Sequence, residues 1–209
     1  MDLEANMVSL VMPTDAPAIK GPPQGRWTQS EWEKLPDDGN RYEIIDGVLY
    51  MSTAPGFTHQ RIIGQLYKML GVPAEEQGLG IAIFAPFGVF MPNCNPVQPD
   101  FVFVAKSQAS IIQERGIFGV PDLIVEILSP GNRAYDEEVK FQAYATANVP
   151  EYVIIDSAAR SLRLNRSPAQ GEYKETQVFD EAQTVAFACL PGIPVLVGKL
   201  FEGAPDTTL

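Results

Sequence analysis

The run Leu123-Ile-Val-Glu-Ile-Leu128 decides the fold class of this chain. It is apolar except for Glu126, and short runs rich in Val and Ile are typical of central strands that are buried on both faces. Residues 134–147 follow with helical spacing, and Tyr152-Val-Ile-Ile-Asp156 is a second buried run. The order strand, helix, strand predicts a crossover unit within a mixed sheet.

Shorter signals predict further elements around this unit. Thr28 and Glu31 form a capping box, which predicts the start of a short helix that runs through Leu35 and is ended by Pro36. Asp46-Gly47 is a hairpin signal, and it predicts two short strands within residues 41–51. Hydrophobic spacing predicts helices at 58–70 and 107–115 and strands at 98–104, 161–166 and 173–179. Residues 81–91 are predicted to form either one strand or a bent pair of strands. We therefore expect an α/β fold with a mixed sheet and exposed β-hairpins.

The length of 209 residues fits one domain with an arm better than two full domains. Residues 1–25 contain several prolines without clear periodicity, so we expect a flexible N-terminal arm or an arm that packs on a partner. Residues 26–209 are expected to form a single domain. The first residues include Asp2 and Glu4 and lack a basic region, which argues against a signal peptide.

The composition excludes several classes of function. With 15 Lys and Arg against 26 Asp and Glu, the net charge is −11, which argues against charge-driven binding to nucleic acid or to an anionic membrane. A nuclease stays open, because a bound divalent cation changes the local field. No apolar run approaches the roughly 20 residues of a membrane span. Cys94 and Cys189 form no CxxC pair, so we expect a reducing cytoplasm, and the single histidine, His59, excludes mechanisms that need two imidazoles.

Two acidic residues lie in strands that otherwise belong to the core. Asp100 precedes the apolar run 101–104, and Glu126 is central in its own run. A buried carboxylate is costly unless it is paired, hydrogen-bonded or bound to a metal, so the two could share one cation or be separately capped. Two carboxylates and a main-chain carbonyl would suffice for Mg²⁺. Asp122 lies roughly 13 Å from Glu126 along the same strand, so we choose Asp100 and interpret Asp122 as a turn or strand-start residue.

Lys140 and Glu43 are the other two candidates for the site. Lys140 borders the apolar face of the helix that follows the Glu126 strand. Its ammonium could orient or help deprotonate a metal-bound water and stabilise charge on a phosphate, or it could pair with Asp136 one turn earlier. Glu43 alternates with apolar residues in a strand that should be half-buried; it could join the site, pair with Arg41 or face solvent.

Several motifs occur together in a specific order and spacing. They are Arg41-Tyr-Glu-Ile-Ile-Asp-Gly47, Val97-Gln-Pro-Asp100, Gly119-Val-Pro-Asp-Leu-Ile-Val-Glu-Ile-Leu-Ser-Pro130, Lys140 with Tyr144, and Val149-Pro-Glu-Tyr-Val-Ile-Ile-Asp156. With these motifs, about residues 27–200 resemble the Uma-type "putative restriction endonuclease" family of the PD-(D/E)XK nuclease superfamily. The resemblance implies a restriction-endonuclease-like fold, in which helices flank a mixed central sheet. It also implies Mg²⁺-dependent hydrolysis of phosphodiester bonds, with Mn²⁺ as an alternative ion.

The resemblance also implies roles for individual residues. Asp100 corresponds to the Asp of the PD element and Glu126 to the acid of the second element, and both would bind the metal. The superfamily pattern places a lysine two residues after that acid, where this chain has Leu128. Lys140 is then the replacement, as in members whose lysine lies on the following helix.

Three further residues are assigned to the site or its border by the same resemblance. Glu43 would complete the acidic cluster, and His59 and Gln98 occupy motif positions that border the site. His59 could instead cap its helix, and Gln98 could simply extend the strand hydrogen bonds. The densest basic run contains Arg160, Arg163 and Arg166, but strand alternation puts Arg163 on the opposite face, so it makes a weak DNA-binding patch.

The leading hypothesis is a Mg²⁺-dependent DNA endonuclease. A metal-activated water would attack a backbone phosphate, and the cation and Lys140 would stabilise the pentavalent charge. One alternative is a non-catalytic metal- or partner-binding regulatory protein on the same fold, which the net charge of −11 favours. Another is a hydrolase of small phosphoesters, which needs no extended basic groove. A homodimer is expected, because cleavage of duplex DNA suits two-fold symmetry.

Overall fold

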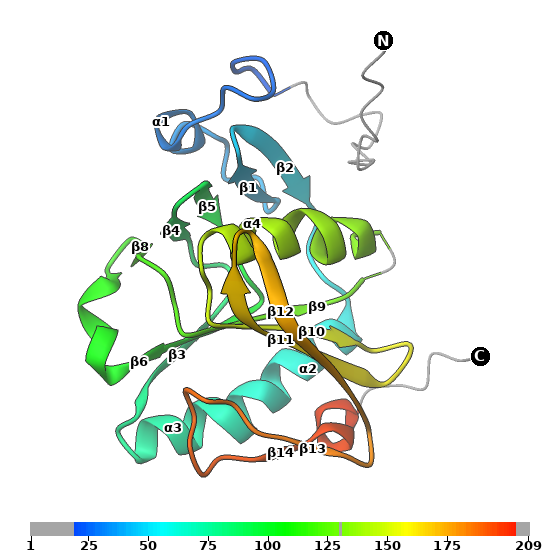
Figure 1. Cartoon of the computed structure of the whole chain (residues 1–209). Helices are drawn as coiled ribbons and strands as arrows, with labels where there is room; N and C mark the ends of the chain where they lie inside the picture. The colour runs from blue at the N-terminus through cyan, green and yellow to red at the C-terminus, as the bar shows by residue number, and fades with distance from the viewer. Residues whose placement is uncertain (1–18, 130, 204–209) are drawn as a thin grey trace.

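The structure, a computed structural model, describes residues 19–129 and 131–203. At its centre lies the strand–helix–strand unit that the sequence predicts (Figure 1). Strands β9 (Leu123–Ile127) and β10 (Glu151–Asp156) pair in parallel. They are connected by a π-helical segment, Tyr135–Lys140, that continues into α4 (Phe141–Thr146). We call residues 135–146 the crossover helix.

Six strands form the main sheet, in the order β12-β11-β10-β9-β6-β3. The strands besides β9 and β10 are β3 (Gly80–Phe84), β6 (Phe101–Ala105), β11 (Ser161–Ala169) and β12 (Glu172–Asp180). The β9–β10 pair is parallel and the other neighbours are antiparallel, so the sheet is mixed. Strand β9 has a paired strand on each side and an apolar cluster on each face of the sheet. It is therefore buried along its whole length, as its apolar sequence predicts.

Shorter strands form a second six-stranded sheet, in the order β2-β1-β5-β4-β8-β7. Their bounds are β1 (Arg41–Ile45), β2 (Val48–Ser52), β4 (Val89–Met91), β5 (Cys94–Val97), β7 (Ile112–Gln113) and β8 (Gly116–Phe118). The β1–β2 hairpin turns at Asp46 and Gly47, both at positive φ, as the sequence predicts. Strands β13 (Thr184–Val185) and β14 (Val195–Leu196) form a separate small pair.

Few helices accompany these sheets. The capping box of Thr28 and Glu31 is present at the start of α1 (Gln29–Trp32), which ends at Trp32 and not at the predicted Leu35. The long helical segment begins with α2 (Phe57–Leu66), passes through a π-helical turn (Tyr67–Gly71) and ends with α3 (Val72–Glu76). Short 3₁₀ turns lie at Lys106–Ile111 and Val197–Phe201. Among the described helices, none has the length and apolar character that a membrane crossing needs.

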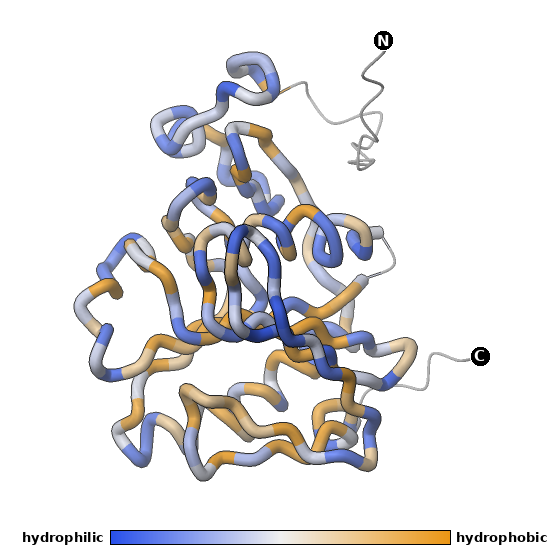
Figure 2. The backbone as a smooth tube through the Cα atoms, in the orientation of Figure 1, coloured by the Kyte–Doolittle hydropathy of each residue, from blue (hydrophilic) through white to orange (hydrophobic). Residues whose placement is uncertain are grey.

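The two faces of the main sheet carry separate apolar clusters, and the central strands are the most hydrophobic part of the chain (Figure 2). On β9, Val125 packs with α2 in one cluster, whereas Ile124 packs with the crossover helix in the other. Since side chains alternate along a strand, Glu126 points to the face of the crossover helix. The register that pairs Phe101 with Val125 brings Asp100 to the same face, next to Glu126.

The expected mixed α/β architecture is confirmed. Of the two alternatives for residues 81–91, the structure has the pair of strands, which divides between β3 of the main sheet and β4 of the second sheet. Two other details differ from the expectations. Strand β5 was not predicted from the sequence. Residues 107–115 are helical only to Ile111, because Ile112 pairs with Ile117 in a short hairpin instead.

Part of the predicted N-terminal arm lies within the described residues. The side chain of Gln24 donates a hydrogen bond to the Leu49 carbonyl and accepts one from the Leu49 N–H, at 3.2 and 2.8 Å. The Gly25 N–H donates to the Gly47 carbonyl at 2.9 Å. Residues 19–25 therefore contact the β1–β2 hairpin, and residues 1–18 lie outside the described residues.

Candidate active site at the junction of the two sheets

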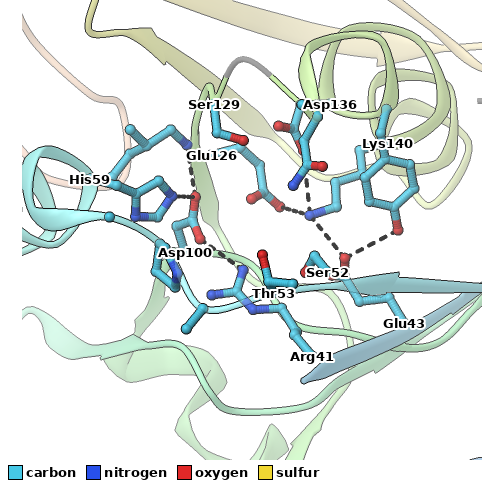
Figure 3. A pocket seen from close by; sticks show the side chains of 17 residues that line it. Arg41, Glu43, Ser52, Thr53, His59, Asp100, Glu126, Ser129, Asp136 and Lys140 are labelled. Carbon is cyan, nitrogen blue, oxygen red and sulfur yellow. Dashed lines mark hydrogen bonds and ion pairs between the residues drawn. The ribbon is translucent and has the colours of Figure 1, made fainter. Parts of the chain in front are cut away.

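A cavity of about 250 Å³ lies where β1 of the second sheet meets β6, β9 and the crossover helix. The loop before α2 and the first turn of that helix close one side of it. Its titratable side chains converge from these separate elements (Figure 3). They are Arg41, Glu43, His59, Asp100, Glu126, Asp136 and Lys140, with Tyr135 beside them.

Asp100 is held by three donors from three different elements. Its Oδ1 accepts a hydrogen bond from Arg41 Nη1 at 2.9 Å, which links β1 to the end of β6. Its Oδ2 accepts from the Ile127 backbone N–H and from His59 Nε2, both at 2.9 Å. Burial alone would raise the pKa of Asp100, but the His59 hydrogen bond and the charges of His59 and Arg41 outweigh it and lower the pKa.

Glu126 shares one of its oxygens between two donors. Lys140 Nζ lies 2.9 Å from Oε1, and the Tyr144 hydroxyl donates to the same oxygen at 2.8 Å. The other oxygen, Oε2, faces the cavity and accepts no hydrogen bond from the described residues (Figure 3). Burial is the largest influence on Glu126 and raises its pKa well above the usual value, with Asp100 adding to the rise and Lys140 opposing it.

Lys140 contacts three carboxylates at once. Its Nζ lies 2.9 Å from Glu126, 3.3 Å from Glu43 Oε2 and 3.5 Å from Asp136 Oδ1. The ring of Tyr135 lies 4.9 Å from the same ammonium. Burial disfavours the charged amine, but the three acids more than compensate and raise its pKa, so Lys140 stays protonated.

Glu43 completes the acidic cluster from the side of β1. Its Oε1 accepts the Gln98 backbone N–H at 2.6 Å, and its Oε2 accepts the Tyr135 hydroxyl at 3.2 Å. Glu43 therefore neither pairs with Arg41 nor faces solvent. Gln98 contributes its main chain here, while its side-chain amide donates to the Tyr42 carbonyl at 3.2 Å and does not line the cavity.

The predicted site residues thus lie close together, apart from the Gln98 side chain. His59 binds Asp100, whereas Gly56 is the N-cap residue of its helix and no side chain in the described part of the chain caps it. Asp122 accepts hydrogen bonds from the Ala105 N–H and the Gln108 amide, at 2.7 and 2.9 Å, which agrees with its interpretation as a strand-start residue outside the site. The arginines of the basic run each pair with an acid: Arg160 with Glu181, Arg163 with Glu137 and Arg166 with Glu151.

Sequence reasoning missed four side chains of this cluster. Asp136 and Arg41 appeared only as possible ion-pair partners, Asp136 of Lys140 and Arg41 of Glu43. Each of these pairs is close in the sequence, one at i,i+4 and the other within one strand, so neither indicated a shared site. Tyr135 and Tyr144 have the spacing of core contacts, and only the structure shows their hydroxyls on the carboxylates. The π-helical segment also departs from the α-helix predicted for residues 134–147, and it contains both Asp136 and Lys140.

The buried charges of the cavity do not balance. Four carboxylates face only two permanent cations, so with all four acids ionised and before any charge on His59 is counted the formal sum is 2 − 4 = −2. The four acids and Lys140 are all at most 5% exposed. Burial raises the pKa of Asp136 to about 7, with Asp100 and Glu43 adding to the rise and Lys140 opposing it. An excess of two negative charges in a small polar cavity is what a divalent cation would neutralise.

The donor set fits a hard divalent ion better than a soft one. The cavity offers carboxylate oxygens, hydroxyls of Ser52, Thr53 and Ser129, and no thiol. Across residues 19–129 and 131–203, no three His, Cys, Asp or Glu side chains are arranged to bind an ion by themselves. Mg²⁺ does not require such a cage, because it keeps several waters and takes one or two protein carboxylates.

Comparisons with a family model and with a solved structure relate this chain to known proteins. The family model Uma2, described as "Putative restriction endonuclease", matches residues 29–197. A crystal structure of a "putative nuclease belonging to DUF820" from Anabaena variabilis ATCC 29413 superposes with a TM-score of 0.70 at 20% identity, covering 83% of this chain and 97% of that one. No curated protein sequence matches. The likeness to the solved structure establishes the shared fold.

Proposed function

The chain belongs to the Uma2 family of putative restriction endonucleases, and we propose that it is a Mg²⁺-dependent endonuclease that hydrolyses phosphodiester bonds in DNA. The observation that carries this proposal is the excess of two buried negative charges in one cavity at the junction of the sheets. Such an excess destabilises the fold unless a bound cation neutralises it. A cation-binding site for a phosphate substrate is the function that this family membership favours.

Asp100 and Glu126 are the proposed metal ligands. They lie on neighbouring strands, on one face of the sheet and in one cavity. Asp100 is fixed by Arg41, His59 and a backbone N–H, so its carboxylate is oriented before any ligand arrives. A divalent ion bound there would supply positive charge for a phosphate and lower the pKa of a coordinated water.

Lys140 acts in this proposal as a permanent cation. Because its pKa is raised by Glu126, Glu43 and Asp136 against the effect of burial, it cannot serve as the proton acceptor. Its ammonium would stabilise charge that develops on the phosphate. In the terms of the PD-(D/E)XK pattern, Asp100 and Glu126 supply the two acids. The amine comes from the crossover helix, since Leu128 occupies the usual lysine position.

Hydrolysis of small phosphoesters is the second candidate. Two observations favour it: the cavity of about 250 Å³ is small, and the arginines of the basic run are engaged in ion pairs. An extended duplex needs several cations free to contact phosphates. The homodimer, the cytoplasmic location and the single domain over residues 26–209 stay predictions.

Cleavage of supercoiled plasmid with Mg²⁺, Mn²⁺ or EDTA tests the leading proposal. We expect nicking or linearisation with either metal ion, none with EDTA, and none by Asp100→Ala or Glu126→Ala. Cleavage that survives both substitutions would remove the proposed site. Turnover of small phosphodiesters without cleavage of DNA would favour the second candidate, and ion binding without either activity would favour the non-catalytic alternative.

A further inference from the structure

The Tyr144 hydroxyl lies among the carboxylates without being one of the groups that a substrate or ion would reach. Tyr144 is fully buried, and it projects from α4 toward β9. Its ring packs edge to face on Tyr152, with centroids 5.0 Å apart, so the ring position is fixed by the core. Its hydroxyl then donates to Glu126 Oε1 at 2.8 Å.

Tyr144 and Lys140 together occupy the same oxygen of Glu126. Two donors lie 2.8 and 2.9 Å from Oε1, an oxygen that has two lone pairs to accept with. Only Oε2 is left facing the cavity (Figure 3). A carboxylate held in this way can offer one oxygen to a ligand in the cavity but not both.

We propose that Tyr144 is a positioning residue that restricts Glu126 to one-oxygen coordination and so selects a small ion such as Mg²⁺ over Ca²⁺. The inference rests on the metal site of the proposed function. Mg²⁺ requires near-octahedral geometry at short distances, whereas Ca²⁺ accepts six to eight oxygens and commonly takes both oxygens of a carboxylate. Removing the Tyr144 donor would leave Lys140 donating to Oε1 and would free one lone pair of this oxygen, which favours the larger ion.

Tyr144→Phe tests this inference, because it removes the hydroxyl and keeps the ring. Tyr173→Phe is the matched control: Tyr173 is buried in the same apolar cluster, and its hydroxyl is buried without a hydrogen-bond partner among the described residues. Affinities for Mg²⁺ and Ca²⁺ are measured by calorimetry on the full chain, for the wild type, both variants and Glu126→Gln. The readout is the ratio of the two affinities within each variant, from which any loss of folded protein cancels.

We expect Tyr144→Phe to lose about 10- to 100-fold in Mg²⁺ affinity, the usual effect of removing a partner of a metal ligand. Ca²⁺ affinity should fall less, so that the Mg²⁺/Ca²⁺ ratio drops by about tenfold, while Tyr173→Phe keeps the wild-type ratio. A Tyr144→Phe ratio equal to that of the control would overturn the inference and leave the metal site in place.

The same measurements separate this inference from the proposed function. If the wild type binds neither ion, or if Glu126→Gln binds both like the wild type, the metal site itself is wrong and the role of Tyr144 falls with it. If the ions bind and the ratio shifts as expected but no DNA is cleaved, the positioning role stands and the endonuclease proposal fails.

Discussion

Removing the Lys140 amine should destabilise the fold, and a divalent cation should restore part of the loss. Lys140 is 2% exposed, and its Nζ lies within 3.5 Å of three carboxylates. In Lys140→Ala these acids keep their burial but lose their shared counterion. Breaking a buried ion pair in this way typically costs about 3–5 kcal/mol, because uncompensated charge stays inside the protein.

The assay is thermal and urea unfolding with EDTA and with excess Mg²⁺. For a chain of this size, about 3–5 kcal/mol corresponds to a Tm lower by roughly 6–20 °C. An ion present at about 100 times its Kd adds about 2.7 kcal/mol to the free energy of unfolding. We expect Mg²⁺ to raise the Tm of the variant more than that of the wild type, because the variant lacks a counterion that the metal can replace.

Lys199→Ala is the matched control. Lys199 pairs with Glu202 at 2.5 Å, but both side chains are more than half exposed. Exposed pairs contribute about 0–1 kcal/mol, so this variant should unfold like the wild type under both conditions. If Lys140→Ala in EDTA also stays within about 1 kcal/mol of the wild type, Lys140 is not the counterion of the cluster and the charge argument for the site fails.

Two further predictions follow from the same excess of negative charge. Burial, Asp100 and Glu43 raise the pKa of Asp136 from 3.8 to about 7 against the effect of Lys140. The folded state therefore holds the Asp136 proton more tightly than the unfolded state does. This stabilisation is fully present below pH 3.8 and is lost as the pH rises through about 7. In EDTA the free energy of unfolding of the wild type should fall by up to about 4 kcal/mol over this pH range, at about 1.36 kcal/mol per pKa unit. Asp136→Asn should flatten the plot of unfolding free energy against pH in the same range. A plot unchanged by the substitution would contradict the raised pKa of Asp136. Glu126→Gln should raise the free energy of unfolding in EDTA at pH 7, because burial raises the pKa of Glu126, with Asp100 adding to the rise and Lys140 opposing it. The same variant should abolish Mn²⁺ binding, measured by electron paramagnetic resonance. A variant less stable than the wild type would contradict the raised pKa of Glu126.

The centre of the fold was predictable because its signals are local. The apolar run around Glu126, the helical spacing after it and the second buried run all lie within one stretch of chain. The second sheet was not predictable in the same way. Strands β4, β5 and β8 have three or four residues each. β4 and β5 pair with each other locally, but the pairing of β5 with β1 and of β4 with β8 joins residues far apart in the sequence. Such short strands carry too few residues for alternation to be read.

The site shows the same division between local and distant information. Asp100 and Glu126 were predicted because a charge inside an apolar strand is conspicuous in the sequence. Arg41 was not, because its contact with Asp100 joins residues 59 positions apart, and nothing near Arg41 in the sequence indicates that partner. Asp136 was assigned correctly as a neighbour of Lys140, but the sequence could not show that Glu126 and Glu43 share the same ammonium.

Lys140 contributes both to the candidate site and to the packing of the two sheets. Glu43 belongs to the second sheet and Glu126 to the main sheet, while Lys140 comes from the crossover helix that packs between them. The Arg41–Asp100 pair crosses the same junction. Both cross-sheet ion pairs therefore lie on the proposed metal ligands or their immediate partners. A variant of these residues can therefore lose activity either because the site no longer binds its ligand or because the two sheets no longer pack together. Measuring ion binding and unfolding on the same protein separates these two causes.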